Sequence, residues 1–154
     1  MKRFVYLLAV LVAAAFVAGS TMAQTNPFVG TWKLNVAKSK FNPGPPFKSF
    51  TLTFTPDGTR KLDLMIADDQ PLKAELPWSD GKEVSVTVIQ GMESATSIST
   101  IQGKTFHDTW KQNGKIIEKV HGVLSPDGRT LTITVDGTPR QGGAYQNRLT
   151  FEKQ

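Results

Sequence analysis

The sequence contains no cysteine and only two histidines among its 154 residues. The missing thiols exclude a disulfide scaffold, a thiolate nucleophile and thiolate-bound zinc or iron–sulfur clusters. With so few soft ligands left, we expect no metal site and no cofactor. Because 39% of the residues are hydrophobic, a chain of this length fits one packed domain whose core alone supplies the stability.

Clustered charge and catalytic motifs are missing as well. The chain has 18 Lys+Arg against 13 Asp+Glu, and the basic residues are scattered rather than gathered in a stripe with aromatic platforms, so we expect no nucleic-acid partner. No Gly-x-Ser-x-Gly elbow occurs, and no nucleophile, histidine and acid are expected to converge. The sequence therefore predicts a protein that is not an enzyme.

The first 23 residues are typical of a secretory signal. Positive charge in residues 1–3 precedes an apolar run over 4–18, and the small residues Thr21 and Ala23 predict cleavage after Ala23. An uncleaved anchor is less favoured, because the run is shorter than the roughly 20 residues of a membrane-spanning helix. We predict a secreted or periplasmic protein without a membrane span, in which residues 24–154 form a single domain.

Turn residues recur at short, regular spacing in the remaining chain. Pro56-Asp57-Gly58, Asn113-Gly114 and Pro126-Asp127-Gly128 are examples, and the segments between turns alternate Val, Ile, Thr and Phe, as in 50–54 and 131–135. No helical period appears after the signal. The pattern predicts an all-β fold, an antiparallel up-and-down meander barrel of about eight to ten strands, with a two-sheet sandwich as the competing architecture.

The turns also predict which residues face each other. The turn at 56–58 pairs Phe50 with Leu64 and Leu52 with Leu62. A turn at 79–81 would place Leu76, Ala74 and Leu72 opposite Val84, Val86 and Val88. The turns at 103–104, 113–114 and 126–128 together predict one inward face made of Ser97, Ser99, Ile101, Phe106, Asp108, Trp110, Ile117, Lys119, His121, Val123, Leu131, Ile133 and Val135. His107 would then point to the opposite face from His121, which argues against a metal site built on both.

Polar groups on this inward face suggest a binding site. Burying charges is costly unless they pair or meet a ligand. We predict that the site contains Ser97, Ser99, Phe106, Asp108, Trp110, Lys119 and His121. In the alternative interpretation, Asp108 and Lys119 form an ordinary cross-strand pair that reaches solvent. A proton-transfer role for Asp108 with His121 is the least supported hypothesis, since no nucleophile accompanies them.

Residues 26–34, Asn-Pro-Phe-Val-Gly-Thr-Trp-Lys-Leu, resemble the opening strand of the calycin superfamily, which includes the lipocalins and fatty-acid-binding proteins. The whole mature chain is also similar to small secreted bacterial lipocalin-like proteins. The Gly-x-Trp of that strand is Gly30 and Trp32 here. In the family, the tryptophan closes the narrow end of the barrel and a basic residue of the last strand packs across it, a position that Arg148 would take.

The sequence departs from the fatty-acid-binding pattern in two places. Three prolines and a glycine within 38–47 cannot form the helical lid of those proteins. Leu149 occupies the position of the arginine that clamps a fatty-acid carboxylate. The resemblance implies a lipocalin-like barrel that binds a small apolar or amphiphilic ligand without catalysis. The alternative is a filled-core structural or protein-interaction barrel, and the sequence leaves the oligomeric state open.

Overall fold

The computed structural model describes residues 26–43, 47–66, 69–90, 94–138 and 143–154. The predicted signal peptide, residues 1–23, lies outside the described residues, so its cleavage after Ala23 stays a prediction. In the described part of the chain, no helix has the length and hydropathy needed to cross a bilayer.

Eleven strands and one short 3-10 helix make up the described chain, and all the strands belong to one antiparallel sheet. The elements are β1 (Gly30–Leu34), η1 (Val36–Lys38), β2 (Ser49–Phe54), β3 (Thr59–Met65), β4 (Pro71–Pro77), β5 (Glu83–Ser85), β6 (Thr87–Gln90), β7 (Ala95–Gln102), β8 (Thr105–Gln112), β9 (Lys115–Leu124), β10 (Thr130–Gly137) and β11 (Tyr145–Lys153). Their order in the sheet is β5-β7-β8-β9-β10-β11-β1-β2-β3-β4-β6.

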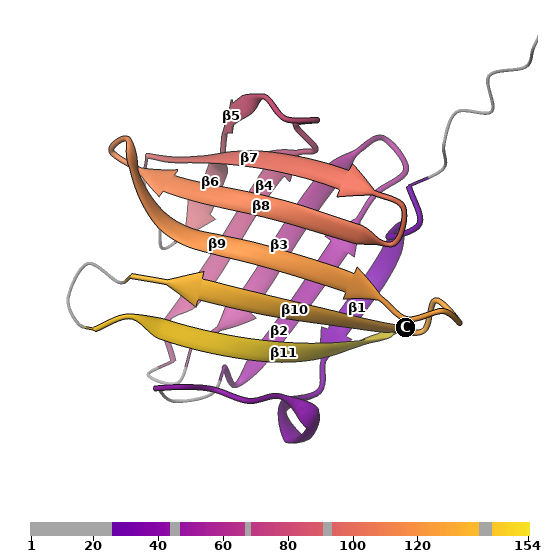
Figure 1. Cartoon of the computed structure of the whole chain (residues 1–154). Coiled ribbons are helices and arrows are strands. Elements are labelled where there is room, and N and C mark those ends of the chain that lie inside the picture. Colours follow the sequence, from indigo (N-terminus) through magenta and orange to yellow (C-terminus); the bar gives the residue numbers. More distant parts are fainter. Residues whose placement is uncertain (1–25, 44–46, 67–68, 91–93, 139–142) are drawn as a thin grey trace, which may run out of the picture.

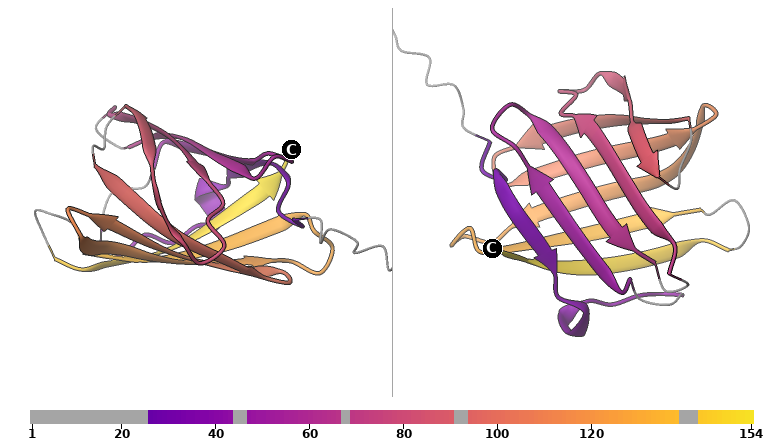
Figure 2. Two further views of the ribbon diagram at one scale, coloured as in Figure 1. Left: turned by 90° about the horizontal axis from the view of Figure 1, so that it is seen from above. Right: turned by 180° about the vertical axis from the view of Figure 1, so that it is seen from behind.

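The two edges of this sheet are consecutive pieces of chain, separated only by Val86. β5 pairs with β7 and β6 pairs with β4, so one bent strand bridges both edges (Figure 1). Figure 2 shows the resulting flattened barrel, in which β7 to β11 form one wall and β1 to β4 form the opposite wall, with strands that run across those of the first. The predicted up-and-down barrel is confirmed. It is nearly closed, because the bridging strand pairs with part of each edge and so shortens the edges that could pair with another chain.

The predicted registers hold in two hairpins and fail in three places, namely after β4 and on both sides of β9. Phe50 lies opposite Leu64 in β2–β3, and Ser99 lies opposite Asp108 in β7–β8, as predicted. The predicted hairpin around 79–81 is wrong: of the expected partners of β4, Val84 pairs with Ser97 of β7, and Ala74 lies opposite Val88 rather than Val86. The physical reason is that residues 79–81, which follow β4, form hydrogen bonds with β7. The Ser99 amide donates to Ser79 Oγ (2.5 Å), and the Gly81 amide donates to the Ser99 carbonyl (2.6 Å).

The predicted orientation of β9 is also wrong. A β-bulge opposite Trp110/Lys111 shifts the β8–β9 register by one residue, so that Asp108 lies opposite Val120 rather than Lys119. Glu118, Val120, Gly122 and Leu124 therefore face the interior. Four residues of β9 were predicted to face the interior and do not. Ile117 lies at the bulge, and Lys119, His121 and Val123 are exposed on the outer face.

One end of the barrel is filled by aromatic side chains. Phe28, Trp32, Phe54, Phe106 and Phe151 are all at most 2% exposed and belong to one cluster. The Trp32 indole Nε1–H donates to the Phe28 carbonyl oxygen (2.8 Å), which pins the segment before β1 across this end. This packing closes the barrel at the Gly-x-Trp strand.

A basic side chain of the last strand does pack on Trp32, but it is Lys153. Its Nζ lies 5.3 Å from the centre of the Trp32 ring, within cation–π range. Gly30 makes this possible, because its φ of +135° disfavours side chains and a Cβ there would lie 2.9 Å from Lys153 Cε. The expectation for Arg148 is therefore corrected: it is exposed on the outer face, where its backbone bridges to Lys40.

Candidate ligand-binding site

The barrel interior holds a cavity of about 200 Å³ beyond the aromatic end. Its walls are mostly aliphatic and aromatic, and they come from both sides of the barrel. The lining residues are Phe47, Phe50, Leu52, Arg60, Leu62, Leu64, Ile66, Leu72, Phe106, Asp108, Trp110, Glu118, Val120, Ile133, Val135, Tyr145, Asn147 and Leu149. A concave, largely apolar space with a few convergent polar groups is the usual form of a small-molecule site.

A buried ion pair lies where the cavity meets the aromatic end. Arg60 of β3 and Asp108 of β8 are 3% and 4% exposed, and the Arg60 Nη1 donates to Asp108 Oδ2. Arg60 Nη2 also donates to Ser99 Oγ (2.8 Å), and the guanidinium carbon lies 4.4 Å from the centre of the Trp78 ring. The ion pair links two opposite walls of the barrel, because Arg60 belongs to β3 and Asp108 to β8. Its two charges cancel, so the pair is electrically neutral as a unit.

This ion pair is incompletely hydrogen-bonded. Arg60 Nε and Asp108 Oδ1 are buried and have no hydrogen-bond partner, and the same holds for Ser97 Oγ. Leaving a buried donor or acceptor unpaired costs roughly 1–3 kcal/mol. One free donor and one free acceptor therefore belong to the two charged residues that line the cavity.

A second polar pair, Glu118 and Tyr145, lines the cavity from β9 and β11. The Tyr145 hydroxyl donates to Glu118 Oε1 across the intervening strand β10. Gly137 of β10 makes room for this contact, because a Cβ there would lie 2.2 Å from Tyr145 Cζ. Burial is the main cause that raises the pKa of Glu118 above its usual 4.5, and the hydrogen bond from Tyr145 opposes it. Burial together with the neighbouring carboxyl raises the pKa of Tyr145.

The structure brings five of the seven predicted site residues to the interior. Phe106, Asp108 and Trp110 line the cavity, Ser99 accepts from Arg60, and Ser97 is fully buried opposite Trp110 without lining the cavity.

Lys119 and His121 do not belong to the interior, because the bulge turns both side chains outward. Asp108 consequently has Arg60 rather than Lys119 as its partner, and the alternative of a solvent-reaching Asp108–Lys119 pair is also wrong.

Four polar residues of the cavity were missed at the level of sequence, namely Arg60, Glu118, Tyr145 and Asn147. A signal for Arg60 was present: the register of the 56–58 hairpin that faces Leu52 with Leu62 also places Arg60 on the inward face. Glu118 could not be found in the same way, because only the bulge turns it inward.

The two histidines are neighbours on the outer wall, contrary to the expectation of one exposed and one interior histidine. His107 lies directly opposite His121, both are exposed, and their rings stack with centres 4.5 Å apart and planes 10° apart. Within the described ranges, no group of three or more metal-ligating His, Asp or Glu side chains occurs.

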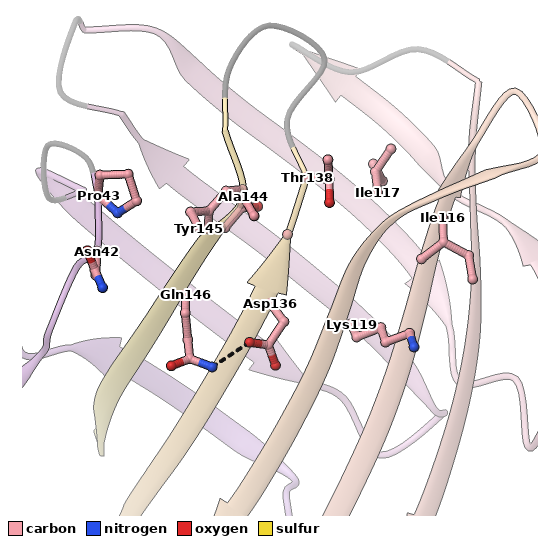
Figure 3. A pocket seen from close by; sticks show the side chains of 11 residues that line it. Asn42, Pro43, Ile116, Ile117, Lys119, Asp136, Thr138, Ala144, Tyr145 and Gln146 are labelled. Atoms are coloured by element: carbon pink, nitrogen blue, oxygen red, sulfur yellow. Dashed lines mark hydrogen bonds between the residues drawn. The ribbon is translucent and has the colours of Figure 1, made fainter.

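A second hollow of about 540 Å³ lies outside the barrel wall (Figure 3). It is lined by residues 42–43, the start of β9, the end of β10 and the start of β11. The side-chain amide of Gln146 donates a hydrogen bond to Asp136 Oδ1 (2.6 Å) in this hollow. Its exposed lining includes Ile116, Lys119 and Asp136. Tyr145 lines both the interior cavity and this outer hollow.

Comparison with known proteins identifies the fold. No protein-family model matches the chain, and no curated protein does. Among solved structures, the chain is similar to the crystal structure of the wild-type fluorescent protein UnaG, with 14% identity and a TM-score of 0.51 over 82% of this chain and 97% of UnaG. The fold is calycin-like. The lipocalin-like architecture expected from the opening strand is thereby confirmed.

Proposed function

We propose that the protein binds one small ligand, with an apolar body and a polar group, inside the barrel. The observation that carries this proposal is the cavity itself, in which apolar walls meet two buried charged residues that each keep one unpaired polar atom. The calycin-like fold supports it, because a barrel of this size can enclose one small ligand.

The dimensions of the cavity restrict the ligand. An apolar cavity of roughly 150 Å³ accommodates benzene, and this one measures about 200 Å³. A ligand of one or two fused rings, or an alkyl chain of about eight carbons, matches that space. Larger lipids exceed this volume.

We infer that the site binds its ligand and does not transform it. The proton-transfer hypothesis requires Asp108 and His121 to meet, but they lie on opposite faces of the barrel wall. Asp108 is held by Arg60, and Glu118 accepts a hydrogen bond from Tyr145. Both interior acids are thus engaged in pairs that suit the recognition of a polar group.

A titration with naphthalene tests whether the cavity accepts a ligand. We expect two-dimensional NMR shifts confined to cavity residues such as Leu62 and Val120, and loss of binding in Val135→Trp, whose larger side chain fills the space. Thr134→Trp is the matched control, since it adds the same side chain to the same strand on the outer face. Shifts that are absent, or that survive Val135→Trp unchanged, would instead favour the filled-core structural barrel.

We also propose that the protein acts outside the cytoplasm, after removal of residues 1–23. The charged start, the apolar run and the small residues before Gln24 support this proposal. Intact-mass measurement of protein recovered from its native host is expected to show a chain that begins at Gln24. A mass that includes Met1 to Ala23 would refute it.

A further inference from the structure

We propose that the cavity selects an uncharged ligand whose polar group is a hydroxyl, such as an aliphatic alcohol or a phenol, in preference to a carboxylate or an ammonium. This inference rests on the proposed function and names the ligand class of the same site. It follows from the charge of the ion pair between Arg60 and Asp108 and from the two atoms that this pair leaves without partners.

The charge of Arg60 is already neutralised. Asp108 accepts from its Nη1, both side chains are more than nine-tenths buried, and no further acid is needed to balance the guanidinium. A ligand carboxylate placed beside this pair would face the negative charge of Asp108, which lines the cavity. A ligand ammonium would face Arg60. Each charged ligand would also lose its hydration on entering an apolar cavity.

The unpaired atoms require a group that both donates and accepts. Arg60 Nε needs an acceptor and Asp108 Oδ1 needs a donor. A hydroxyl can donate to an acceptor such as Asp108 Oδ1 and can also accept from a donor such as Arg60 Nε. A carboxylate only accepts and an ammonium only donates, so each leaves one of these buried atoms unsatisfied.

The other polar groups of the cavity agree with a neutral ligand. Burial raises the pKa of Glu118, which favours its uncharged form. The Tyr145 hydroxyl and the Asn147 amide are neutral, and they complete the polar part of the lining. The apolar remainder, with Phe47, Phe50 and Val135 among its members, fits the alkyl or aromatic body.

Isothermal titration of the full chain with three ligands of one length tests the inference: 1-octanol, octanoate and octylammonium at pH 7. We expect octanol to bind at least about tenfold more tightly than either charged analogue, as expected when a buried polar atom is left unsatisfied. Octanoate or octylammonium binding as tightly as octanol would overturn the inference while the proposed binding function stands. If naphthalene and all three octyl compounds fail to bind, the proposed function itself fails.

Asp108→Asn supplies the sharper arm of the same experiment. It removes the compensating charge while keeping the size of the side chain, so the guanidinium is left unneutralised and the preference should reverse toward octanoate. Asp63→Asn is the matched control, because it makes the same change on the exposed face of β3 and should leave the preference unchanged. An unchanged preference for octanol in Asp108→Asn would contradict the role of the ion pair.

A double variant covers the case in which Asp108→Asn does not fold. Arg60→Met combined with Asp108→Leu replaces the ion pair by apolar side chains, a change that buried pairs often tolerate. It should still bind naphthalene but lose most of its affinity for octanol relative to the natural chain. Retention of full octanol affinity would show that the hydroxyl is not recognised by this pair.

Discussion

The two ends of the barrel are built from the same strands but differ in how their interiors are filled. At the end crossed by the segment before β1, Phe28 and Trp32 are fully buried and pack together in one aromatic cluster. Toward the other end, Phe50 of β2 and Val135 of β10 are only partly buried and line an open space of about 200 Å³. The filled end supplies most of the packing, and the hollow end presents the polar groups.

This difference separates stability from recognition within one small sheet. Close packing at one end allows the other end to leave polar atoms unpaired and apolar surface uncovered. The ion pair between Arg60 and Asp108 lies near the boundary between the two regions, because it lines the cavity together with Phe106, which also belongs to the aromatic cluster. Substitutions at the filled end should therefore mainly lower the free energy of unfolding, whereas those at the hollow end should mainly alter ligand binding.

The largest loss of stability is expected from Trp32→Ala at the filled end. Removing a fully buried aromatic side chain costs about 3–5 kcal/mol, whereas Phe50→Ala at the hollow end should cost about 1–2 kcal/mol, because Phe50 is only partly buried. Urea unfolding at pH 7 measures both values. Equal costs would contradict the division of the barrel into a filled and a hollow end.

A comparable loss is expected when the boundary ion pair is broken. Asp108→Ala leaves Arg60 buried without its counter-charge, which costs about 3–5 kcal/mol. Replacing both partners, by Arg60→Met with Asp108→Leu, should restore the free energy of unfolding to within about 1 kcal/mol of the natural chain. If the double variant were as unstable as the single one, the pair would not act as a unit.

Two glycine substitutions compare the ends at a smaller scale. In Gly122→Ala the new Cβ would lie 2.0 Å from Cε1 of the fully buried Phe106, so we expect a loss of about 3 kcal/mol. In Gly137→Ala the Cβ meets Tyr145, which is only partly buried and can swing aside at a cost of about 1 kcal/mol. Thermal unfolding ranks the two variants, and the reverse order would contradict the assignment of the rigid end.

The smallest effect is a pH dependence from Glu118 at the hollow end. Its folded-state pKa is raised above 4.5, so its contribution to stability is complete below the unfolded pKa and is lost as pH rises through the folded value. Glu118→Gln should therefore remove a decline in stability that begins near pH 4.5. Glu152→Gln is the control, because Lys38 and Asn35 lower the pKa of that exposed carboxyl, whose contribution is lost only as pH falls. A flat difference between the natural chain and Glu118→Gln would refute the burial of this acid.

The sequence predicted the barrel and most of its inward face because turn chemistry determines register when the loop length is known. Pro56-Asp57-Gly58 closes a three-residue loop, with the Thr55 amide donating to the Thr59 carbonyl (2.9 Å). Pro126-Asp127-Gly128 contains the same three residues, but there the Ser125 amide donates to the Thr130 carbonyl (2.8 Å), so the loop is one residue longer. The motif alone does not distinguish these two lengths.

The inward and outward faces of β9 were predicted the wrong way round, because the register is shifted by one residue on each side of this strand. The bulge opposite Trp110/Lys111 introduces the first, and the longer loop at 126–129 introduces the second, so they cancel for β10 and leave Leu131 and Ile133 inward as predicted. The composition of β9 gives no warning, since both of its faces mix apolar with polar residues. Glu118 was not predicted as a site residue because this error placed its side chain on the outer face.

A crystal structure of the protein soaked with bromobenzene would show whether the hollow end takes up an apolar ligand. We expect an anomalous bromine signal inside the barrel, between Phe50, Val120 and Val135, with none among the rings around Trp32. Bromine found only on the outer surface, or an interior in which side chains already fill the space between these three residues, would contradict it.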